Sequence, residues 1–293
     1  MNIWITGFNL SIDTVIEITT KDKYQRLHGR QWKSVGSKGA NVFRSLIKLG
    51  VCPHLVGFTW GKTGQFINSI LHNICPNPYH IHTFHIKKED SRINVITLKD
   101  GSETLISASS PSVDKNAINF LISISKQIQS KDVLIITGSF PKNLGIKDVL
   151  PLTKHIPQDH IFIDLKGKYL IDAYHYFPKA IFKVNHIESH DLTTQGLFPD
   201  KLIVTSAMRT VAHINGKHII INIPITTPLN TIGAGDVFMA SLVFEKMINH
   251  KNWEESLQYA AARATASIKT LGVSEWDEEE TNGLIKLIKV YHP

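Results

Sequence analysis

Seven residues in the C-terminal third, Asn230-Thr231-Ile232-Gly233-Ala234-Gly235-Asp236, combine small side chains with a carboxylic acid. Small residues at 233–235 let the backbone approach a ligand closely. The apolar run at 237–244 predicts a buried helix beginning near Gly235, whose first unpaired N–H groups would form an anion site. Asp236 would lie in the first turn, where the helix dipole favours the ionised acid. This arrangement suits phosphoryl transfer to a hydroxyl group, which needs a base and donors for the moving charge.

A simpler interpretation is that Asp236 only caps a helix after a glycine-rich turn, since short glycine motifs are weak signals. The elements around the motif help to decide between the two. Apolar runs that predict strands alternate with helical patterns through the middle of the chain, which indicates a parallel sheet covered by helices on both faces. The predicted strands cover 3–6, 55–58, 133–137, 161–164, 180–185 and 202–205.

Polar residues follow several of these strands directly. In open parallel sheets, ligands bind at the carboxyl ends of the strands. Polar groups gathered there favour a binding site over a bare helix cap. The residues at those ends are Asn9, Asp13, Gly138, Ser139, Asp164, Lys183, Asn185, Thr205 and the Gly233 loop.

Turn signals and helical periodicity predict the remaining elements. Asp100-Gly101 and Asn215-Gly216 each separate two strand-like runs, as in hairpins. The segment 36–41 precedes a helical pattern that stops at Gly50, and so gives a second junction between a loop and a helix. Further helices are expected at 65–72, 116–128, 147–155, 169–176 and 253–271.

The composition is that of an ordinary globular protein of 293 residues, with 42% hydrophobic and 19% charged residues. A formal net charge of +7 is compatible with acidic ligands. The basic residues are scattered singly, however, which argues against nucleic acid as a partner. Two cysteines, the absence of a leader-like N-terminus and the lack of a membrane-spanning run lead us to expect a cytoplasmic protein without a membrane partner.

Two motifs resemble signatures of the PfkB, or ribokinase-like, family of sugar kinases. Gly36-Ser37-Lys38-Gly39-Ala40-Asn41-Val42 is similar to the family's N-terminal signature, and the stretch 230–236 is similar to its C-terminal signature. The resemblance extends from about residue 5 to 272. It implies a single domain over 1–293, with a doubly wound, mostly parallel α/β sheet and a small β-sheet lid from about 10–34 and 86–108. A homodimer formed through the lid is a further expectation.

Three segments look like the branch of this family that phosphorylates fructose-1-phosphate or tagatose-6-phosphate. They are Asn9-Leu10-Ser11-Ile12-Asp13, Ser91-Arg92-Ile93-Asn94-Val95 and 137–141. By this resemblance, Asp13 and Asn41 would contact the sugar, while Arg92 and Ser139 would hold the phosphate already on it. Lys38 would assist, and Arg26 roughly matches a basic lid residue.

The resemblance also implies ATP and Mg²⁺ as cofactors. Asp236 would be the catalytic base, and Gly233, Ala234 and Gly235 would stabilise the transferred group. Asn185 and Glu188 match the family's Asn-x-x-Glu motif, which governs Mg²⁺ largely through bound water. The candidate nucleotide-binding residues are Lys183, Asn185, Thr205 and Ala207.

Several positions depart from the family pattern. The turn after Thr205 reads Ser206-Ala207-Met208-Arg209-Thr210 where the family usually has glycines, so these side chains could crowd ATP. Ser37, Val237 and Lys166 also replace customary residues. We therefore expect an active kinase with altered preference that phosphorylates a hydroxymethyl group of a sugar phosphate. The alternatives are a kinase for a neutral sugar or a nucleoside, and a weakly active relative that binds a sugar phosphate as a sensor.

Other local signals are weaker. The run 57–63 looks like a P-loop but is one residue too short, which favours a simple turn. His80 and His82 would share one face of a strand, yet no third ligand is spaced for zinc. His186 and His190 are helically spaced without the adjacent Glu of a zinc protease. The alanines at 260–262 indicate helix packing.

Overall fold

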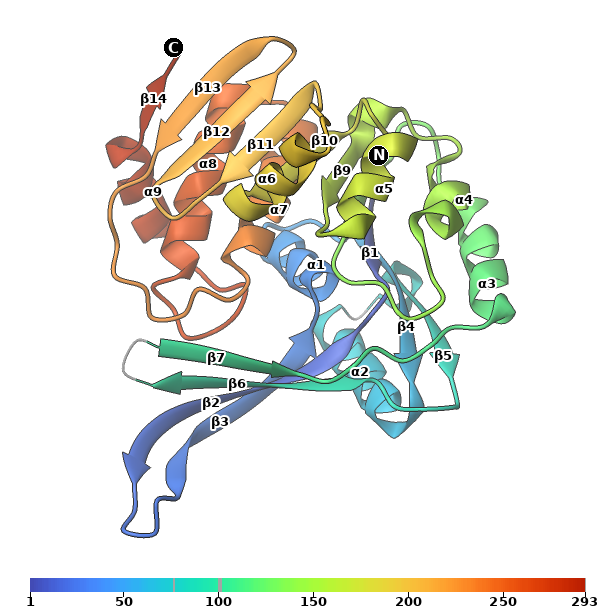
Figure 1. Ribbon diagram of the computed structural model, residues 1–293, viewed down its shortest axis with the longest axis vertical. Coiled ribbons are helices and arrows are strands. Elements are labelled where there is room, and N and C mark those ends of the chain that lie inside the picture. The colour runs from blue at the N-terminus through green and yellow to red at the C-terminus, as the bar shows by residue number, and fades with distance from the viewer. Residues whose placement is uncertain (76, 100–101, 293) are drawn as a thin grey trace.

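The computed structural model describes residues 1–75, 77–99 and 102–292. Its main sheet has ten strands among these residues, in the order β14-β13-β12-β11-β10-β9-β8-β1-β4-β5 (Figure 1). The seven strands from β11 to β5 are parallel, and β12, β13 and β14 extend the sheet in antiparallel fashion. Their bounds are β1 (Ile3–Gly7), β4 (His54–Trp60), β5 (Ile81–Ile86), β8 (Val133–Thr137), β9 (Ile161–Asp164), β10 (Ile181–Asn185), β11 (Lys201–Thr205), β12 (Arg209–Ile214), β13 (Lys217–Asn222) and β14 (Lys289–Tyr291).

Helices cover both faces of this sheet. Alternate residues of a strand point to opposite faces, so that Ile3 and Ile5 join one core while Trp4 joins the other. The first core is completed by α1 (Lys38–Lys48), α2 (Gly61–Ile74), α7 (Ala234–Val243), α8 (Trp253–Ser267) and α9 (Glu278–Leu287). The second is completed by α3 (Lys115–Ser125), α4 (Leu150–Thr153), α5 (Lys168–Tyr176) and α6 (His186–Thr194).

Short helical segments connect several of these elements. They are the 3₁₀ turns η1 (Pro78–His80), η2 (Ile146–Val149) and η3 (Gln158–His160), and the π-helical turn η4 (Phe244–Ile248) after α7. The expected doubly wound α/β fold is confirmed. No helix within the described residues is both long and apolar enough to cross a membrane.

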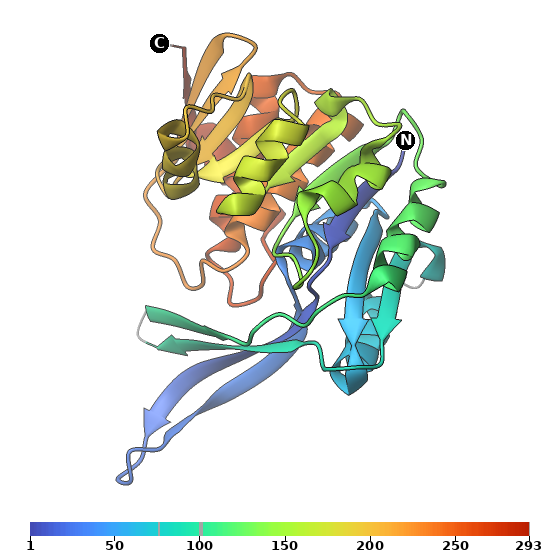
Figure 2. The same ribbon diagram turned by 45° about the vertical axis from the view of Figure 1, so that its right-hand side comes forward.

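A second sheet projects from the main body (Figures 1 and 2), and we call it the lid. Its four strands lie in the order β3-β2-β6-β7, with β2 parallel to β6 and the other neighbours antiparallel. The strands come from both segments of the chain in which the lid was expected. The predicted Asp100-Gly101 turn lies outside the described residues. The strands are β2 (Ser11–Lys21), β3 (Leu27–Gly36), β6 (Arg92–Lys99) and β7 (Ser102–Ser107).

Some local predictions were wrong. Helix α8 ends at Ser267, not Leu271, and α2 begins at Gly61, before the expected Gln65. The expected helix at 147–155 is a 3₁₀ turn followed by a single α-helical turn, where Pro151 lacks the N–H that a longer helix needs. The C-terminal elements α9 and β14 were not predicted, because their patterns are short and mixed.

Candidate active site

Asp236 lies in the first turn of α7, and 5% of it is exposed to solvent. The helix is capped by Gly233, whose φ of 83° is the left-handed conformation that glycine adopts most easily. A side chain at Gly233 would also come within 2.6 Å of Val273. The motif therefore places an acid at the start of a helix, where the first N–H groups lack the carbonyl partners of a helix interior.

Asn41 holds the carboxylate of Asp236 in place. Its Nδ2 donates a 2.7 Å hydrogen bond to Oδ2 of Asp236, and its Oδ1 accepts a 2.7 Å bond from Nη2 of Arg44. Arg44 thus fixes which end of the Asn41 amide faces the acid. Burial raises the pKa of Asp236 to about 6, while the charge of Lys38 and the bond from Asn41 oppose that rise. The group can be a base at neutral pH.

Two lysines converge on a buried acid at the end of β9. Lys38 Nζ lies 2.5 Å from Oδ1 of Asp164, and Lys183 Nζ lies 3.0 Å from Oδ2. Burial alone would raise the pKa of Asp164, but the two ammonium charges hold it below its ordinary value. A Cβ added at Gly235 would lie 2.8 Å from Lys183 Nζ, so the amine sits directly over the anion loop.

Asp13 lies on β2 and belongs to the lid. It accepts hydrogen bonds from Ser11 Oγ at 3.0 Å and from Asn94 Nδ2 at 2.7 Å. Burial raises its pKa above the ordinary value, and these two bonds oppose that effect. Gly36 is required beside it, because a Cβ there would come within 1.9 Å of Asp13 Oδ1. Asp13 is therefore a fixed acceptor for a donor such as a hydroxyl group.

Arg92 and Ser139 meet at the junction of the lid and the main sheet. Arg92 Nη2 donates to the Asn9 carbonyl oxygen at 3.2 Å and to Ser139 Oγ at 3.4 Å. Asn9 Nδ2 also donates to Ser139 Oγ, at 3.0 Å. The structure thus brings together the two residues that the resemblance assigned to one phosphate group.

Asn185 and Glu188 form a reciprocal cap at the start of α6. Asn185 Oδ1 accepts a 2.9 Å bond from the Glu188 N–H, and Glu188 Oε2 accepts a 2.8 Å bond from the Asn185 N–H. Both residues line a cavity of about 580 Å³ that also contains Ser139 and Lys166. Among the residues that the structure describes, no group of three or more His, Cys, Asp or Glu is arranged to hold a metal directly.

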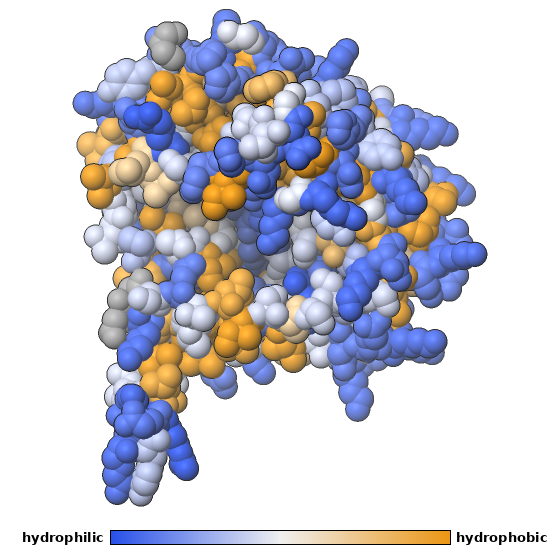
Figure 3. Space-filling view, viewed as in Figure 1, coloured by the Kyte–Doolittle hydropathy of each residue, from blue (hydrophilic) through white to orange (hydrophobic). Residues whose placement is uncertain are grey.

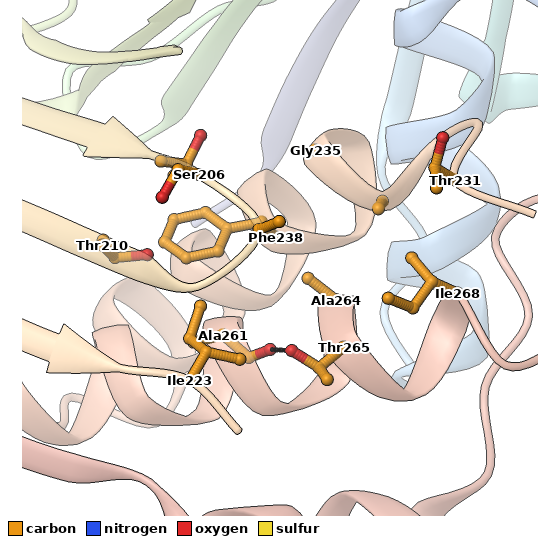
Figure 4. Close-up of a pocket in the computed structure, with 13 residues that line it drawn as sticks. Ser206, Thr210, Ile223, Thr231, Gly235, Phe238, Ala261, Ala264, Thr265 and Ile268 are labelled. Carbon is orange, nitrogen blue, oxygen red and sulfur yellow. Dashed lines mark hydrogen bonds between the residues drawn. The ribbon is translucent and has the colours of Figure 1, made fainter. Parts of the chain in front are cut away.

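A second cavity, of about 260 Å³, lies beside the anion loop, which contributes Gly235 to its lining (Figure 4). Thr205, Ala207 and Gly235 line it, and most of its lining surface is apolar. The other lining residues carry aliphatic, aromatic or hydroxyl side chains and are Ser206, Thr210, Ile223, Thr231, Ala234, Phe238, Ala261, Ala264, Thr265 and Ile268. The glycine-free turn at 206–210 is closed by hydrogen bonds between Ser206 and Arg209. Met208 is 62% exposed and does not line the cavity. A space for a planar apolar group therefore remains beside this turn.

Arg26 is the one candidate that lies apart from the others. It is at the exposed tip of the β2–β3 hairpin, where its guanidinium lies 5.7 Å from the ring of Tyr24. Figures 1 and 2 show this tip projecting away from the main body. The expectation that His80 lies on a strand was wrong, since it is in the turn η1.

Sequence reasoning missed three features of this site. Arg44 was not singled out, although it follows Asn41 by three residues and so lies on the same helical face. Asp164 was noted as a strand-end residue without a role, and its two lysine partners are distant in the chain. Asn94 was quoted in a motif but not assigned to Asp13.

Comparison with known proteins gives one family match and relatives of known name. Residues 179–280 match the profile of the pfkB family carbohydrate kinases. The chain is 29% identical over 252 residues to a 1-phosphofructokinase from Borreliella burgdorferi, covering 79% of this chain and 80% of the relative. Over these residues the chain is similar to the pfkB family of carbohydrate kinases.

Solved structures with the same fold include two kinases. Phosphofructokinase-2 from Escherichia coli, solved with substrates and products, superposes with a TM-score of 0.84 at 17% identity and covers 98% of this chain and 99% of that one. Ribokinase from Arabidopsis thaliana, solved with ribose and ATP, superposes with a TM-score of 0.69 at 18% identity. The superposition covers 97% of this chain and 98% of that one. At these identities the likeness shows the fold alone, which is ribokinase-like.

Proposed function

We propose that this kinase transfers the γ-phosphoryl group of ATP to a hydroxymethyl group of a sugar phosphate, of the fructose-1-phosphate or tagatose-6-phosphate type. The observation that supports this most directly is the position of Arg92 and Ser139, whose side chains meet close to Asp13. A guanidinium next to a hydroxyl acceptor suits a substrate that carries both a phosphate and hydroxyl groups. The name of the relative from Borreliella burgdorferi agrees with this class of substrate.

Asp236 is the base in this proposal. With a pKa of about 6 it is mostly ionised at neutral pH and can accept the proton of the attacking hydroxyl. The N–H groups at 233–235 and the Lys183 ammonium lie where negative charge would grow on the moving group. Hydroxyl attack opposite the leaving oxygen then completes the in-line transfer.

The residues of the 260 Å³ cavity fit the base and ribose of a nucleotide. Its lining is mainly apolar, which suits a planar ring, and Gly235 at its edge gives access to the anion loop. A triphosphate bound there would extend from the cavity towards Asp236. ATP supplies the phosphoryl group when bound.

Asn185 and Glu188 fit a hydrated Mg²⁺ by their chemistry, because amide and carboxylate oxygens are hard ligands. Glu188 uses Oε2 in the helix cap, and Oε1 can accept a hydrogen bond from a water ligand of the ion. When bound, Mg²⁺ would neutralise charge on the nucleotide phosphates. Holding the ion through water agrees with its reluctance to lose its hydration shell.

We also propose that two copies associate through the outer face of the lid. Val95 pairs with Thr14 on one side and with Ile106 on the other, so these residues share the outer face. The same face also carries Ile16 and Ile93. The exposed fraction is 50% for Ile93 and 62% for Ile106. Figure 3 shows hydrophobic residues at several places along the lid, between hydrophilic ones. Apolar area of this kind marks contact surfaces. Ile106→Asp should halve the molar mass measured by light scattering, whereas an unchanged mass would count against a lid dimer.

The test of function begins with turnover of neutral sugars, nucleosides and sugar phosphates with Mg-ATP. Asp236→Asn is then assayed on the best substrate. Loss of the base should lower turnover by roughly 10²–10⁴-fold while binding of the sugar persists. Near-parental turnover in this variant would refute the role of Asp236. Binding of a sugar phosphate by a parent that does not turn it over would favour the sensor alternative.

A further inference from the structure

The inner face of the lid carries three successive rungs of paired residues. The first rung is polar and includes the sugar-binding candidate Asp13. The next two rungs are farther along the same strands, on the same face because alternate residues share a face. The rungs are Asp13–Asn94–Ser107, Val15–Ile96–Leu105 and Glu17–Leu98–Glu103.

Side chains of the second and third rungs contact the loop that leads to the catalytic base. Ile232 of this loop packs against the cluster formed by Val15, Ile96 and Leu98. Beside it, Glu103 Oε2 accepts two hydrogen bonds from Thr231, one from the backbone N–H at 3.2 Å and one from Oγ1 at 3.0 Å. One strand of the lid is therefore fastened to the second residue of the Asn230–Asp236 motif.

Thr231 also contributes to the nucleotide cavity. It lines that cavity together with Gly235 and Ile268 (Figure 4), and it lines the small cavity beside Glu103. Its carbonyl oxygen accepts a 3.3 Å bond from the Ala234 N–H, at the start of α7. Thr231 is thus the point where the lid, the nucleotide cavity and the anion loop meet.

We infer that Glu103 is a positioning residue that couples binding of the sugar phosphate to binding of the nucleotide. This inference rests on the proposed function of the same site. A sugar phosphate held by Asp13 and Arg92 keeps the lid against the main body. The lid then holds Thr231 through Glu103, whose ionised oxygen makes stronger hydrogen bonds than a neutral one. Because such coupling is reciprocal, each ligand should increase the affinity for the other.

The test compares Glu103→Ala and Glu103→Gln with the parent. The affinity for a non-hydrolysable ATP analogue with Mg²⁺ is measured by calorimetry, with and without the sugar phosphate that the parent turns over fastest, starting from fructose-1-phosphate. The parent should bind the analogue at least about 5-fold more tightly when the sugar phosphate is present. Glu103→Ala should lose most of this factor, while its affinity for the analogue alone changes by less than about twofold.

Glu103→Gln should keep most of the coupling, because its amide oxygen can accept both bonds from Thr231. Thr104→Ala is the matched control, since Thr104 is exposed on the same strand and points to the opposite face. A parent that binds neither ligand would overturn the proposed function and this inference together. Binding of both ligands with equal coupling in the parent and in Glu103→Ala would overturn only the role of Glu103. If Glu103→Ala bound the analogue more tightly than the parent does in the absence of the sugar phosphate, the role of Glu103 would also be overturned. Glu103 would then compete with the nucleotide for Thr231.

Discussion

Asn41 Nδ2 donates a 2.7 Å hydrogen bond to Oδ2 of Asp236 and thereby joins α1 to the first turn of α7. Each helix carries part of one of the two motifs that resemble the family signatures, so this single bond connects the proposed sugar-binding segment to the proposed base. The bond also stabilises the ionised form of an acid whose burial favours the neutral form. Activity and stability should therefore both depend on the ionisation of Asp236.

The first prediction concerns the pH dependence of catalysis. Because burial raises the pKa of Asp236 to about 6, kcat/KM should increase with pH through about pH 6 and level off above it. Steady-state assays from pH 5 to 8, at saturating Mg²⁺ and constant ionic strength, measure this profile. A flat profile across that range would show that another group is the base.

The second prediction concerns stability. The folded-state pKa of Asp236 is raised, so the folded chain binds its proton more tightly than the unfolded chain does. Below about pH 4 Asp236 is protonated in both the folded and the unfolded chain, so its ionisation does not change the free energy of unfolding. Above about pH 6 it is ionised in both, and its ionisation lowers the free energy of unfolding most. Asp236→Asn removes this cost and should increase the free energy of unfolding at pH 8 by about 1–3 kcal/mol. Urea unfolding at pH 4 and pH 8 tests it, and equal effects at the two pH values would disagree with this account.

The third prediction separates the effect of the Asn41 side-chain amide on the base from the effect of contacts to the Asn41 backbone. Asn41→Ala removes the bond that lowers the pKa of Asp236, so the acid limb of the kcat/KM profile should move to higher pH. Ser45→Ala is the control, because Ser45 Oγ donates only to the Asn41 carbonyl oxygen. Its profile should match the parent. Coincident acid limbs for Asn41→Ala and the parent would mean that the amide does not tune the base.

The fourth prediction concerns Mg²⁺. Glu188→Gln keeps an oxygen for the helix cap but removes the charge, so folding should persist while more Mg²⁺ is needed for half-maximal turnover. Asp191→Asn, which lines the same cavity, is the control and should titrate as the parent does. If Glu188→Gln gave the parent's Mg²⁺ titration curve, the metal assignment would be wrong.

The two junctions between a loop and a helix were predictable because each is formed by one short, continuous segment of the chain. Gly36–Asn41 and Asn230–Asp236 carry small residues, a polar residue and an apolar helix pattern in a short span. Contacts such as Lys38–Asp164 and Glu103–Thr231 were not predictable, since they join residues 126 and 128 positions apart. Local periodicity describes elements and their faces, whereas these contacts depend on how elements that are distant in the chain pack together: α1 with the end of β9, and the lid with the loop before α7.

Arg26 illustrates the same limit. The resemblance matched it roughly to a basic lid residue at the substrate, but the β2–β3 hairpin extends beyond the main body and carries Arg26 away from it. The distance of the hairpin tip from the main body depends on the lengths of β2 and β3, which no local motif predicts. The glycine-free turn at 206–210 is a similar case, because the outward direction of Met208 could not be read from the sequence.

The most direct test of the central claim is Arg92→Ala assayed on a matched pair, fructose and fructose-1-phosphate. Loss of one charge-assisted contact should cost about 1.5–3 kcal/mol, or roughly 10- to 150-fold in affinity for the phosphorylated sugar. Fructose offers no phosphate to the guanidinium, so its kinetic constants should change little. A selective loss on fructose-1-phosphate is the predicted result. An equal loss on both sugars, or a parent enzyme that prefers fructose, would contradict the assignment as a sugar-phosphate kinase.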